Sequence, residues 1–457
     1  MSPMKVALVG VILVVAVGMW LVFGDGSVRK TAELKTVEVI GNIAMRTIPD
    51  DVAGGFHKIP IERRELAPGI YQATGVSNAH RIVTDAGDVL FDTGLALQVP
   101  QQMELLQEVS DRPLTHIIVS HSHADHMGGV KFWREDDTEI IAHEEYEEEQ
   151  RYLKELEPYL HHRNRILFPW MPESPPEIGL IAYGGVDPTI TVGYDDYVFE
   201  QGGVRFEVMH TPGAEGADNL SLWLPEQKIL FSGDTLGPLF PQFPNVFTMR
   251  GEKVRKPIEY IETLNRFIGL DIEMLVPGHH SPVTGKENIR AALTKIRDAT
   301  RYVHDETVKG MNEGKTVYEL MEEIRLPLEL ELTQEHGKVS WAVRSIWEYY
   351  ATWFHFDSIT ELYPVPAREM YPDLAELAGV DAIVTKAREH SEAGRPVEAL
   401  HLLEVALSGQ PGNREALGLR RSTLEGMLQA AIDGDGNNYE KDYLRQQIDM
   451  TKEALAD

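Results

Sequence analysis

The sequence predicts an α/β body followed by an all-helical C-terminal part. From about residue 60, short β-branched or aromatic runs end in Gly, Asp and Asn turn signals and alternate with segments of helical spacing. After residue 285 the strand signals stop and the chain has only helical patterns. Strands mixed with helices in this order favour a layered body in which helices cover sheets. The length of 457 residues leaves room for two or three domains, each with its own core.

The N-terminus carries an uncharged apolar run of a length that can span a membrane. After Lys5 it reads "VALVGVILVVAVGMWLVFG", close to the ~20 residues that cross a bilayer as a helix. Met19, Trp20 and Phe23 at its far end favour a retained anchor over a cleaved signal, which usually ends in a small-x-small site. We therefore expect residues 1–30 to be a signal or transmembrane anchor, and the body to be periplasmic or otherwise extracytoplasmic. Retention and cleavage both stay open.

The predicted body occupies residues 31–300. Strands are expected in the segments 69–76, 79–94, 114–120, 197–213, 219–234 and 272–280. Helices are expected at 99–111 and, in one very acidic stretch, at 138–162. The acidic run "EEYEEEQ" in the latter is typical of a solvated helix face.

The helical part is expected as a connection over 301–370 and a C-terminal domain over 371–457. Helices are expected at 286–311 and 339–356, and the aromatic residues of the second are expected in a core or an interface. A Pro-rich hinge at 363–373 then leads to a block at 380–421, whose breaks at Gly394 and Pro411 predict one tetratricopeptide-like hairpin. Because a lone hairpin cannot bury its apolar face, it should pack on the body or on another subunit.

Composition narrows the chemistry. The chain has 43 basic and 72 acidic residues, and a formal charge of −29 argues against nucleic-acid binding because it repels phosphate backbones. It contains no cysteine, so a metal would have to be held by imidazole and carboxylate groups.

The stretch "HSHADHMGG", directly after a predicted strand, crowds metal-binding side chains into one loop. His121 and His123 suit one Zn²⁺, and Asp125 with His126 suits a second, since zinc accepts nitrogen and oxygen ligands. Further ligands are available after later strands: Glu215 or Asp218, Asp234, and His279 or His280. This ordered series predicts a dinuclear metal site. The remaining histidines at 143, 161, 162 and 401 are expected to be ordinary surface or core residues.

Over residues 60–290, this order of motifs resembles the metallo-β-lactamase superfamily. The resemblance implies an αββα sandwich with two Zn²⁺ at one sheet edge, and places Asp125 and Asp234 at the reacting centre. Asp92 matches the family's usual aspartate, which orients a ligand histidine by accepting its ring N–H.

One branch fits more of the chain. "TPGAEGAD" resembles the alkylsulfatase "TPGTEAPAE", which supplies a glutamate where most members read "TPGH", and this favours Glu215 as a ligand. "FPNVFTMRG" resembles "HNLYTLRG", which implies that Asn245, Thr248 and Arg250 bind sulfate. The C-terminal helices resemble the branch's dimerisation domain, which implies a homodimer. The chain departs from the branch in reading "SGD" for "AEN", so Asp234 replaces a glutamate as the bridging carboxylate.

The resemblance thus implies a dizinc hydrolase that cleaves alkyl sulfate or related sulfate esters with a metal-bridging hydroxide. A hydrolase of the same fold acting on a lactone, thioester or phosphodiester is the alternative. A non-catalytic interaction protein with a structural metal is disfavoured, because structural zinc sites are usually closed four-ligand cages. The alkyl group, the bond cleaved (C–O or S–O) and the native metal stay open.

Overall fold

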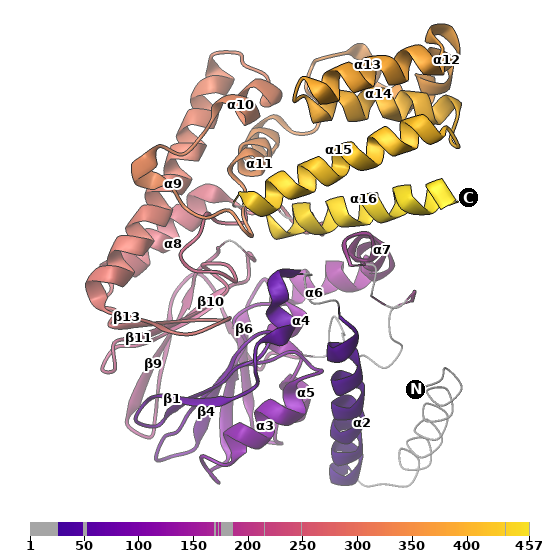
Figure 1. Cartoon of the computed structure of the whole chain (residues 1–457). Coiled ribbons are helices and arrows are strands. Elements are labelled where there is room, and N and C mark those ends of the chain that lie inside the picture. Colours follow the sequence, from indigo (N-terminus) through magenta and orange to yellow (C-terminus); the bar gives the residue numbers. More distant parts are fainter. Residues whose placement is uncertain are drawn as a thin grey trace. The chain divides into compact units, whose positions relative to one another are not determined.

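The structure is a computed structural model that describes residues 26–48, 53–168, 171, 173–174, 186–213, 215–247, 249–434 and 436–456 (Figure 1). The apolar run expected to be an anchor, residues 6–24, lies outside the described residues. Within the described part, no helix combines the length and the apolar character needed to cross a membrane.

The chain divides into two compact units. Unit 1 comprises residues 1–162, 172–246 and 255–301, and unit 2 comprises residues 163–171, 247–254 and 302–457. The last change of unit, after residue 301, lies one residue from the predicted end of the body at residue 300. The sequence predicts a division of the chain into consecutive segments. It therefore does not predict that two short segments, residues 163–171 and 247–254, belong to unit 2.

Unit 1 contains two mixed sheets. The first has seven strands in sequence order: β1 (Arg63–Ala67), β2 (Ile70–Ala73), β3 (Ala79–Ile82), β4 (Asp88–Thr93), β5 (Leu114–Ile118), β6 (Glu139–His143) and β7 (Ile190–Val192). The second runs in the order β13 (Val283–Thr284), β12 (Met274–Pro277), β11 (Ile229–Gly233), β10 (Leu220–Leu224), β9 (Val204–His210) and β8 (Tyr197–Gln201). Strands β4 to β7 are mutually parallel, as are β11 and β12, and the other pairs are antiparallel.

The apolar core lies in layers around these sheets. Side chains of both sheets, such as Phe91, Val208 and Phe231, form one buried cluster between them. A second cluster joins the other face of the first sheet to helices, with Leu90 packed among Val99 and Val37. Every residue of β4 and β11 is buried, as expected of strands that are covered on both faces.

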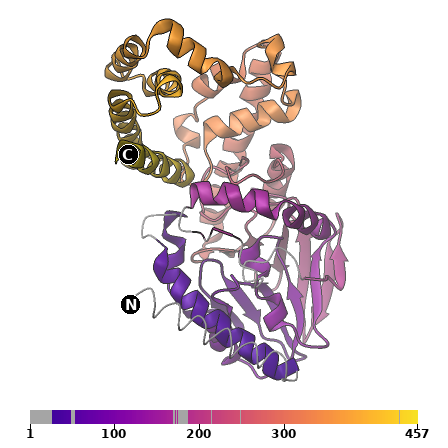
Figure 2. The ribbon, with the colours of Figure 1, turned by 90° about the vertical axis from the view of Figure 1, so that its right-hand side faces the viewer.

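Helices pack on the outer face of the first sheet. The helices between residues 26 and 312 are α2 (Gly26–Thr47), α3 (Val99–Gln107), α4 (Ala124–Met127), α5 (Val130–Trp133), α6 (Tyr146–Glu155), α7 (Glu157–Leu167), α8 (Pro257–Gly269) and α9 (Lys286–Asn312), with a 3₁₀ turn η1 (Ala53–Lys58). Figure 2 shows α2 running along the outer side of the first sheet. This arrangement confirms the expected αββα sandwich.

One expected helix is wrong at its start. The segment 138–162 begins with strand β6, and its first long helix, α6, starts only at Tyr146. Ile140 and Ile141 are fully buried, and β6 pairs in parallel with β5 and β7. Two β-branched residues inside a sheet have a local preference for strand, which the acidic helical pattern that follows conceals in the sequence.

Unit 2 is helical, which confirms the predicted fold class. It contains α10 (Val317–Glu323), η2 (Leu328–Leu330), α11 (Val339–Ala351), η3 (Ile359–Leu362), η4 (Ala367–Met370), α12 (Tyr371–Ala378), α13 (Val380–Glu392), α14 (Pro396–Gly409), α15 (Arg414–Asp433) and α16 (Asn438–Ala456). The predicted hairpin is α13 and α14, which share a core around Ala387, Leu403 and Ala406. Gly394 turns the chain between them with φ +71°.

The helix expected at 339–356 is shorter than predicted. It ends at Ala351, and Thr352 follows with φ +63°. Trp353 and Phe356 are 68% and 85% exposed, so these two aromatic residues do not belong to the core of the described structure. They remain candidates for an interface.

Candidate metal centre

The histidine-rich loop lies at the carboxyl end of a sheet strand. Strand β5 ends at Ile118, His121 and His123 follow in the loop, and Asp125 and His126 lie in the short helix α4. Asp234 follows β11 and His279 follows β12. Because β11 and β12 are parallel, their carboxyl ends meet at one edge, which brings these two residues together.

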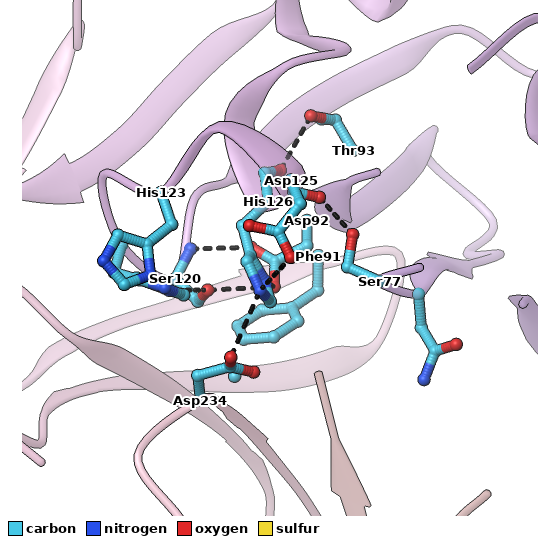
Figure 3. A network of polar contacts seen from close by, with 12 residues as sticks. Ser77, Phe91, Asp92, Thr93, Ser120, His123, Asp125, His126 and Asp234 are labelled. Atoms are coloured by element: carbon cyan, nitrogen blue, oxygen red, sulfur yellow. Dashed lines mark hydrogen bonds and ion pairs between the residues drawn. The ribbon is translucent and has the colours of Figure 1, made fainter. Parts of the chain in front are cut away.

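Asp92, at the end of β4, holds the ring of His126. Its Oδ2 accepts hydrogen bonds from His126 Nδ1 at 2.8 Å and from the Ser120 hydroxyl at 2.9 Å, and its Oδ1 accepts from the Ser120 backbone N–H at 2.8 Å (Figure 3). Since Nδ1 carries the donated proton, Nε2 of His126 presents its lone pair to the other side. Asp92 has φ +56°, an uncommon backbone conformation that these bonds hold in place.

Two of the possible metal-binding groups of the described residues overlap, because they share His126. His121, His126 and Asp234 form one group, and Asp125, His126 and His279 form the other, with the donor atoms of each within 4.8 Å of one another. The distances include 3.4 Å from His126 Nε2 to Asp125 Oδ2, 3.5 Å to Asp234 Oδ2, and 2.9 Å from His279 Nε2 to Asp234 Oδ2.

A glycine at position 278 lets these groups converge. A Cβ there would lie 2.3 Å from Asp234 Oδ1 and 2.7 Å from His126 Cε1, closer than atoms can approach. The Gly of "PGHH" is therefore required by packing at the cluster. His279 Nδ1 donates to the carbonyl of Val76, which turns its Nε2 toward Asp234.

The residues fit a bound cation. His121 Nε2, His126 Nε2 and Asp234 Oδ1 are buried and have no hydrogen-bond partner. Buried polar atoms are rarely left unsatisfied, and three that face one cluster of imidazoles and carboxylates are what metal ligands look like without their ion.

The electrostatics of the cluster also favour a cation. Burial opposes the ionisation of Asp234, but the imidazoles of His279 and His126 outweigh it and hold the pKa of Asp234 well below its usual range. Burial likewise opposes a charge on His126, but the carboxylates of Asp234, Asp125 and Asp92 raise its pKa well above the usual value. Three carboxylates thus create a field in which a proton or a metal ion is stabilised.

Glu215 lies beside His123. Its Oε2 is 3.7 Å from His123 Nδ1 and 3.1 Å from Arg255 Nη2, and the side chains of Glu215 and Arg255 are almost fully buried. Arg255 also donates to the carbonyl of Asn245 at 2.7 Å. Sequence reasoning missed Arg255, because nothing in the mixed-charge run "MRGEKVRK" distinguishes it from its exposed neighbours.

The sequence left two choices of metal ligand open: His279 or His280, and Glu215 or Asp218. His279 is 5% exposed and belongs to the cluster, whereas His280 is exposed and has φ +59°. Asp218 is buried but is not among the grouped ligands, and burial together with the charge of Glu149 raises its pKa to about 7. Glu215, close to His123, is the better placed of the two acids.

Two family models match the chain. The model of the metallo-beta-lactamase superfamily matches residues 73–279, and the model of alkyl sulfatase dimerisation matches residues 316–443. The two matches follow one another along the chain without overlapping. The metal-ligand series from His121 to His279 therefore lies within the residues that match the metallo-beta-lactamase model.

Similar proteins carry alkylsulfatase names. A linear primary-alkylsulfatase of a Pseudomonas species is 31% identical over 319 residues, which cover 64% of this chain and 59% of that protein. An alkyl/aryl-sulfatase of Saccharomyces cerevisiae is 25% identical, over 79% of this chain and 60% of that protein. The chain thus spans about three-fifths of the length of these relatives.

A solved structure has the same fold. The stereoselective inverting sec-alkylsulfatase Pisa1 from a Pseudomonas species superimposes with a TM-score of 0.75 at 21% identity, covering 90% of this chain and 70% of that chain. The likeness in fold extends over nine-tenths of this chain.

The structure does not test whether the three expected sulfate-binding residues lie together. Asn245 is 2% exposed and belongs to unit 1, Arg250 belongs to unit 2, and Thr248 lies outside the described residues. Their joint role stays a prediction from the resemblance.

The other histidines fit the ordinary roles expected of them. His143 stacks on His210 with ring centroids 3.9 Å apart, and the side chain of His401 is 69% exposed. Neither these nor His161 and His162 occur in the possible metal-binding groups of the described residues.

Proposed function

We propose that the protein hydrolyses alkyl sulfates or related sulfate esters at a site that holds two Zn²⁺. The observation that carries the proposal is the buried cluster of His121, His126 and Asp234, in which His121 Nε2, His126 Nε2 and Asp234 Oδ1 lack hydrogen-bond partners. The alkylsulfatase names of similar proteins support sulfate esters as the substrate class.

Seven side chains would hold the metals. They are His121, His123, Asp125, His126, Glu215, Asp234 and His279. Bound zinc ions supply a water acidified toward neutral pH and polarise the bond under attack. Imidazole and carboxylate ligands suit zinc, and the chain has no cysteine to compete with them.

The chain's own residues prepare these ligands. Asp92 fixes the tautomer and the ring plane of His126, and Arg255 holds the carboxylate of Glu215. Asp125 and Asp234 both have lowered pKa values, because nearby imidazoles outweigh the opposing effect of burial. Both therefore stay ionised at neutral pH, available as ligands and as hydrogen-bond acceptors for the attacking water.

Substrate recognition would use the motif "FPNVFTMRG". We assign Asn245, Thr248 and Arg250 to the sulfate oxygens on the strength of the matched sequence. A guanidinium group is permanently charged and its paired N–H donors match two oxygens of a tetrahedral anion.

The test is a substrate panel. The full-length, zinc-loaded protein is assayed on short and long alkyl sulfates, a lactone, a thioester and a phosphodiester. We expect release of inorganic sulfate, reduced at least about a hundredfold in Asp234→Asn, because Asp234 would lose the charge with which it would hold metal. The exposed Asp85→Asn, whose side chain is 90% accessible, is the matched control. Ready opening of the lactone without sulfate release would support the alternative hydrolase instead.

Assembly and location are further parts of the proposal. The match to the alkyl sulfatase dimerisation model supports a homodimer formed through the helical domain. The apolar run of residues 6–24 supports a membrane-anchored or exported protein. Fractionation of cells that express the full chain, with and without residues 1–24, tests this location: an unchanged cytoplasmic distribution would remove it.

A further inference from the structure

The loop that carries Arg250 belongs to the helical unit. Residues 247–254 group with 163–171 and with 302–457. Arg163 in α7 binds the backbone of the loop, because its Nη2 donates to the carbonyl of Met249 at 2.7 Å and its Nε to that of Arg250 at 3.0 Å. Gly251 has φ +88°, and a Cβ there would lie 2.8 Å from Arg163 Nε. The backbone next to Arg250 is therefore held closely.

The side chain of Arg250 is held on two sides. Its Cζ lies 5.9 Å from the centre of the Tyr439 ring, and its Nη2 is 3.1 Å from Glu252 Oε1. A guanidinium within about 6 Å of an aromatic face is attracted by the ring's negative face. The side chain of Arg250 is 28% exposed, so part of it can still be reached by a ligand.

Tyr439 is itself fixed at the start of α16. It is 8% exposed, and its backbone N–H donates to Asn437 Oδ1 at 3.0 Å. Asn437 is fully buried and donates to the carbonyl of His336 at 2.7 Å. The ring of Tyr439 also lies 5.2 Å from that of His336 and 6.2 Å from that of Phe168. A ring held by so many neighbours is a rigid surface for Arg250.

We propose that Tyr439 is a positioning residue for the sulfate-binding arginine. Its ring restricts the long side chain of Arg250 to orientations in which the guanidinium is ready for a sulfate group. An ordered donor binds an anion more tightly than a free one, because less conformational freedom is lost on binding. The inference rests on the proposed function.

The experiment compares three variants of the full-length, metal-loaded protein. Tyr439→Leu removes the aromatic face, Tyr439→Phe keeps it, and Tyr443→Leu changes a tyrosine one turn later in α16 that is 39% exposed. We expect Tyr439→Leu to raise KM for an alkyl sulfate about five- to tenfold with little change in kcat. The dissociation constant of inorganic sulfate, measured by calorimetry, should rise by the same factor. Tyr439→Phe should restore both values, and Tyr443→Leu should leave them unchanged.

A double-mutant cycle separates positioning from general damage to the fold. In an Arg250→Ala background, Tyr439→Leu should change KM and sulfate affinity less than about twofold, because the group it positions is gone. Equal effects of Tyr439→Leu with and without Arg250, or no effect in either background, would overturn the inference and leave the proposed function standing. A wild-type protein that neither releases sulfate from any alkyl sulfate nor binds sulfate would overturn the proposed function and this inference together.

Discussion

Asp92 is not one of the proposed metal ligands, but it orients one of them, His126. It accepts from His126 Nδ1 and from two donors of Ser120, and through the imidazole it fixes which nitrogen faces the cluster. We predict that Asp92→Ala weakens metal binding about 10- to 100-fold, the usual loss when a ligand histidine loses its carboxylate partner. Competition with a chelator of known zinc affinity measures it.

The matched control for Asp92 is Asp85→Ala. Its carboxylate is 90% exposed and lies 3.3 Å from Arg112, so it forms only a surface ion pair. Zinc affinity should not change. An Asp92→Ala protein that binds zinc like the wild type would show that the tautomer of His126 does not matter to the site.

His80 predicts how stability depends on pH. It is fully buried between the sheets, and burial lowers its pKa from 6.5 to about 3. Below pH 6.5 His80 is therefore protonated in the unfolded chain but stays neutral in the folded chain. The free energy of unfolding consequently falls as the pH drops. Between pH 7 and pH 5 this residue alone should reduce the free energy of unfolding by about 2 kcal/mol.

Substituting His80→Gln tests this dependence. Urea unfolding of the chelated protein at pH 7 and pH 5 should show a smaller acid loss in the variant than in the wild type, by about 2 kcal/mol. Chelation removes the contribution of metal release at low pH. Parallel losses in the two proteins would mean that His80 is not the group responsible.

The sequence predicts the metal ligands better than the groups that hold those ligands in place. His121, Asp234 and His279 stand in motifs at strand ends, and the structure brings them into one cluster. Arg255 and the carbonyl of Val76 hold ligands through contacts between distant parts of the chain, which no local pattern reveals.

Helix α2 depends on a close approach to the loop before α3. A Cβ at Gly41 would lie 2.2 Å from the carbonyl oxygen of Leu97, while Val37 on the same helix is 3% exposed in the core. We predict that Gly41→Ala reduces the free energy of unfolding by about 1–3 kcal/mol, because the helix must move away from the sheet. Chemical unfolding of the full chain measures the change.

Gly426→Ala in the middle of α15 provides the comparison. No atom lies within 4 Å of its added Cβ, so the substitution should stabilise the protein by up to about 1 kcal/mol through helix propensity. Should Gly41→Ala stabilise the protein to the same extent, the packing of α2 described above would be wrong.

Elements with a long, uniform pattern are the ones that the sequence predicts well. The strand at 229–233 and the helix at 286–312 follow their patterns closely. The sequence pattern does not reveal strand β6, because the strand is only five residues long and the acidic helices follow soon after it. Its partner strands also lie elsewhere in the chain. The end of α11 at Ala351 was also missed, since Thr352 leaves the helix through a backbone conformation that its side chain does not favour.

At the scale of the molecule, the helical unit exposes an apolar segment between residues 349 and 377. Its exposed large side chains are Tyr349, Tyr350, Trp353, Phe356, Ile359, Leu362, Tyr363, Val365, Met370, Leu374 and Leu377. The segment lies within the match to the dimerisation model. Exposed apolar surface of this extent is typical of interaction sites, which agrees with the proposed homodimer.

We predict that the double substitution Trp353→Asp and Phe356→Asp weakens self-association at least tenfold, because charges cannot be buried in the contact without partners. Sedimentation velocity over a range of protein concentrations measures it. Leu328→Asp is the control, since Leu328 is 83% exposed but lies outside the segment. Equal dimer fractions in all three proteins would place the contact elsewhere.

The proposed hydrolase needs a pair of metal ions in the cluster around His126, and this metal content can be measured. The full-length protein, purified without added metal or chelator, is analysed by mass spectrometry for metal per chain, together with Asp234→Ala. We predict about two zinc ions per wild-type chain and fewer than one in the variant. A correctly folded wild-type protein that carries no stoichiometric metal, and takes up none on addition of zinc, would contradict the account.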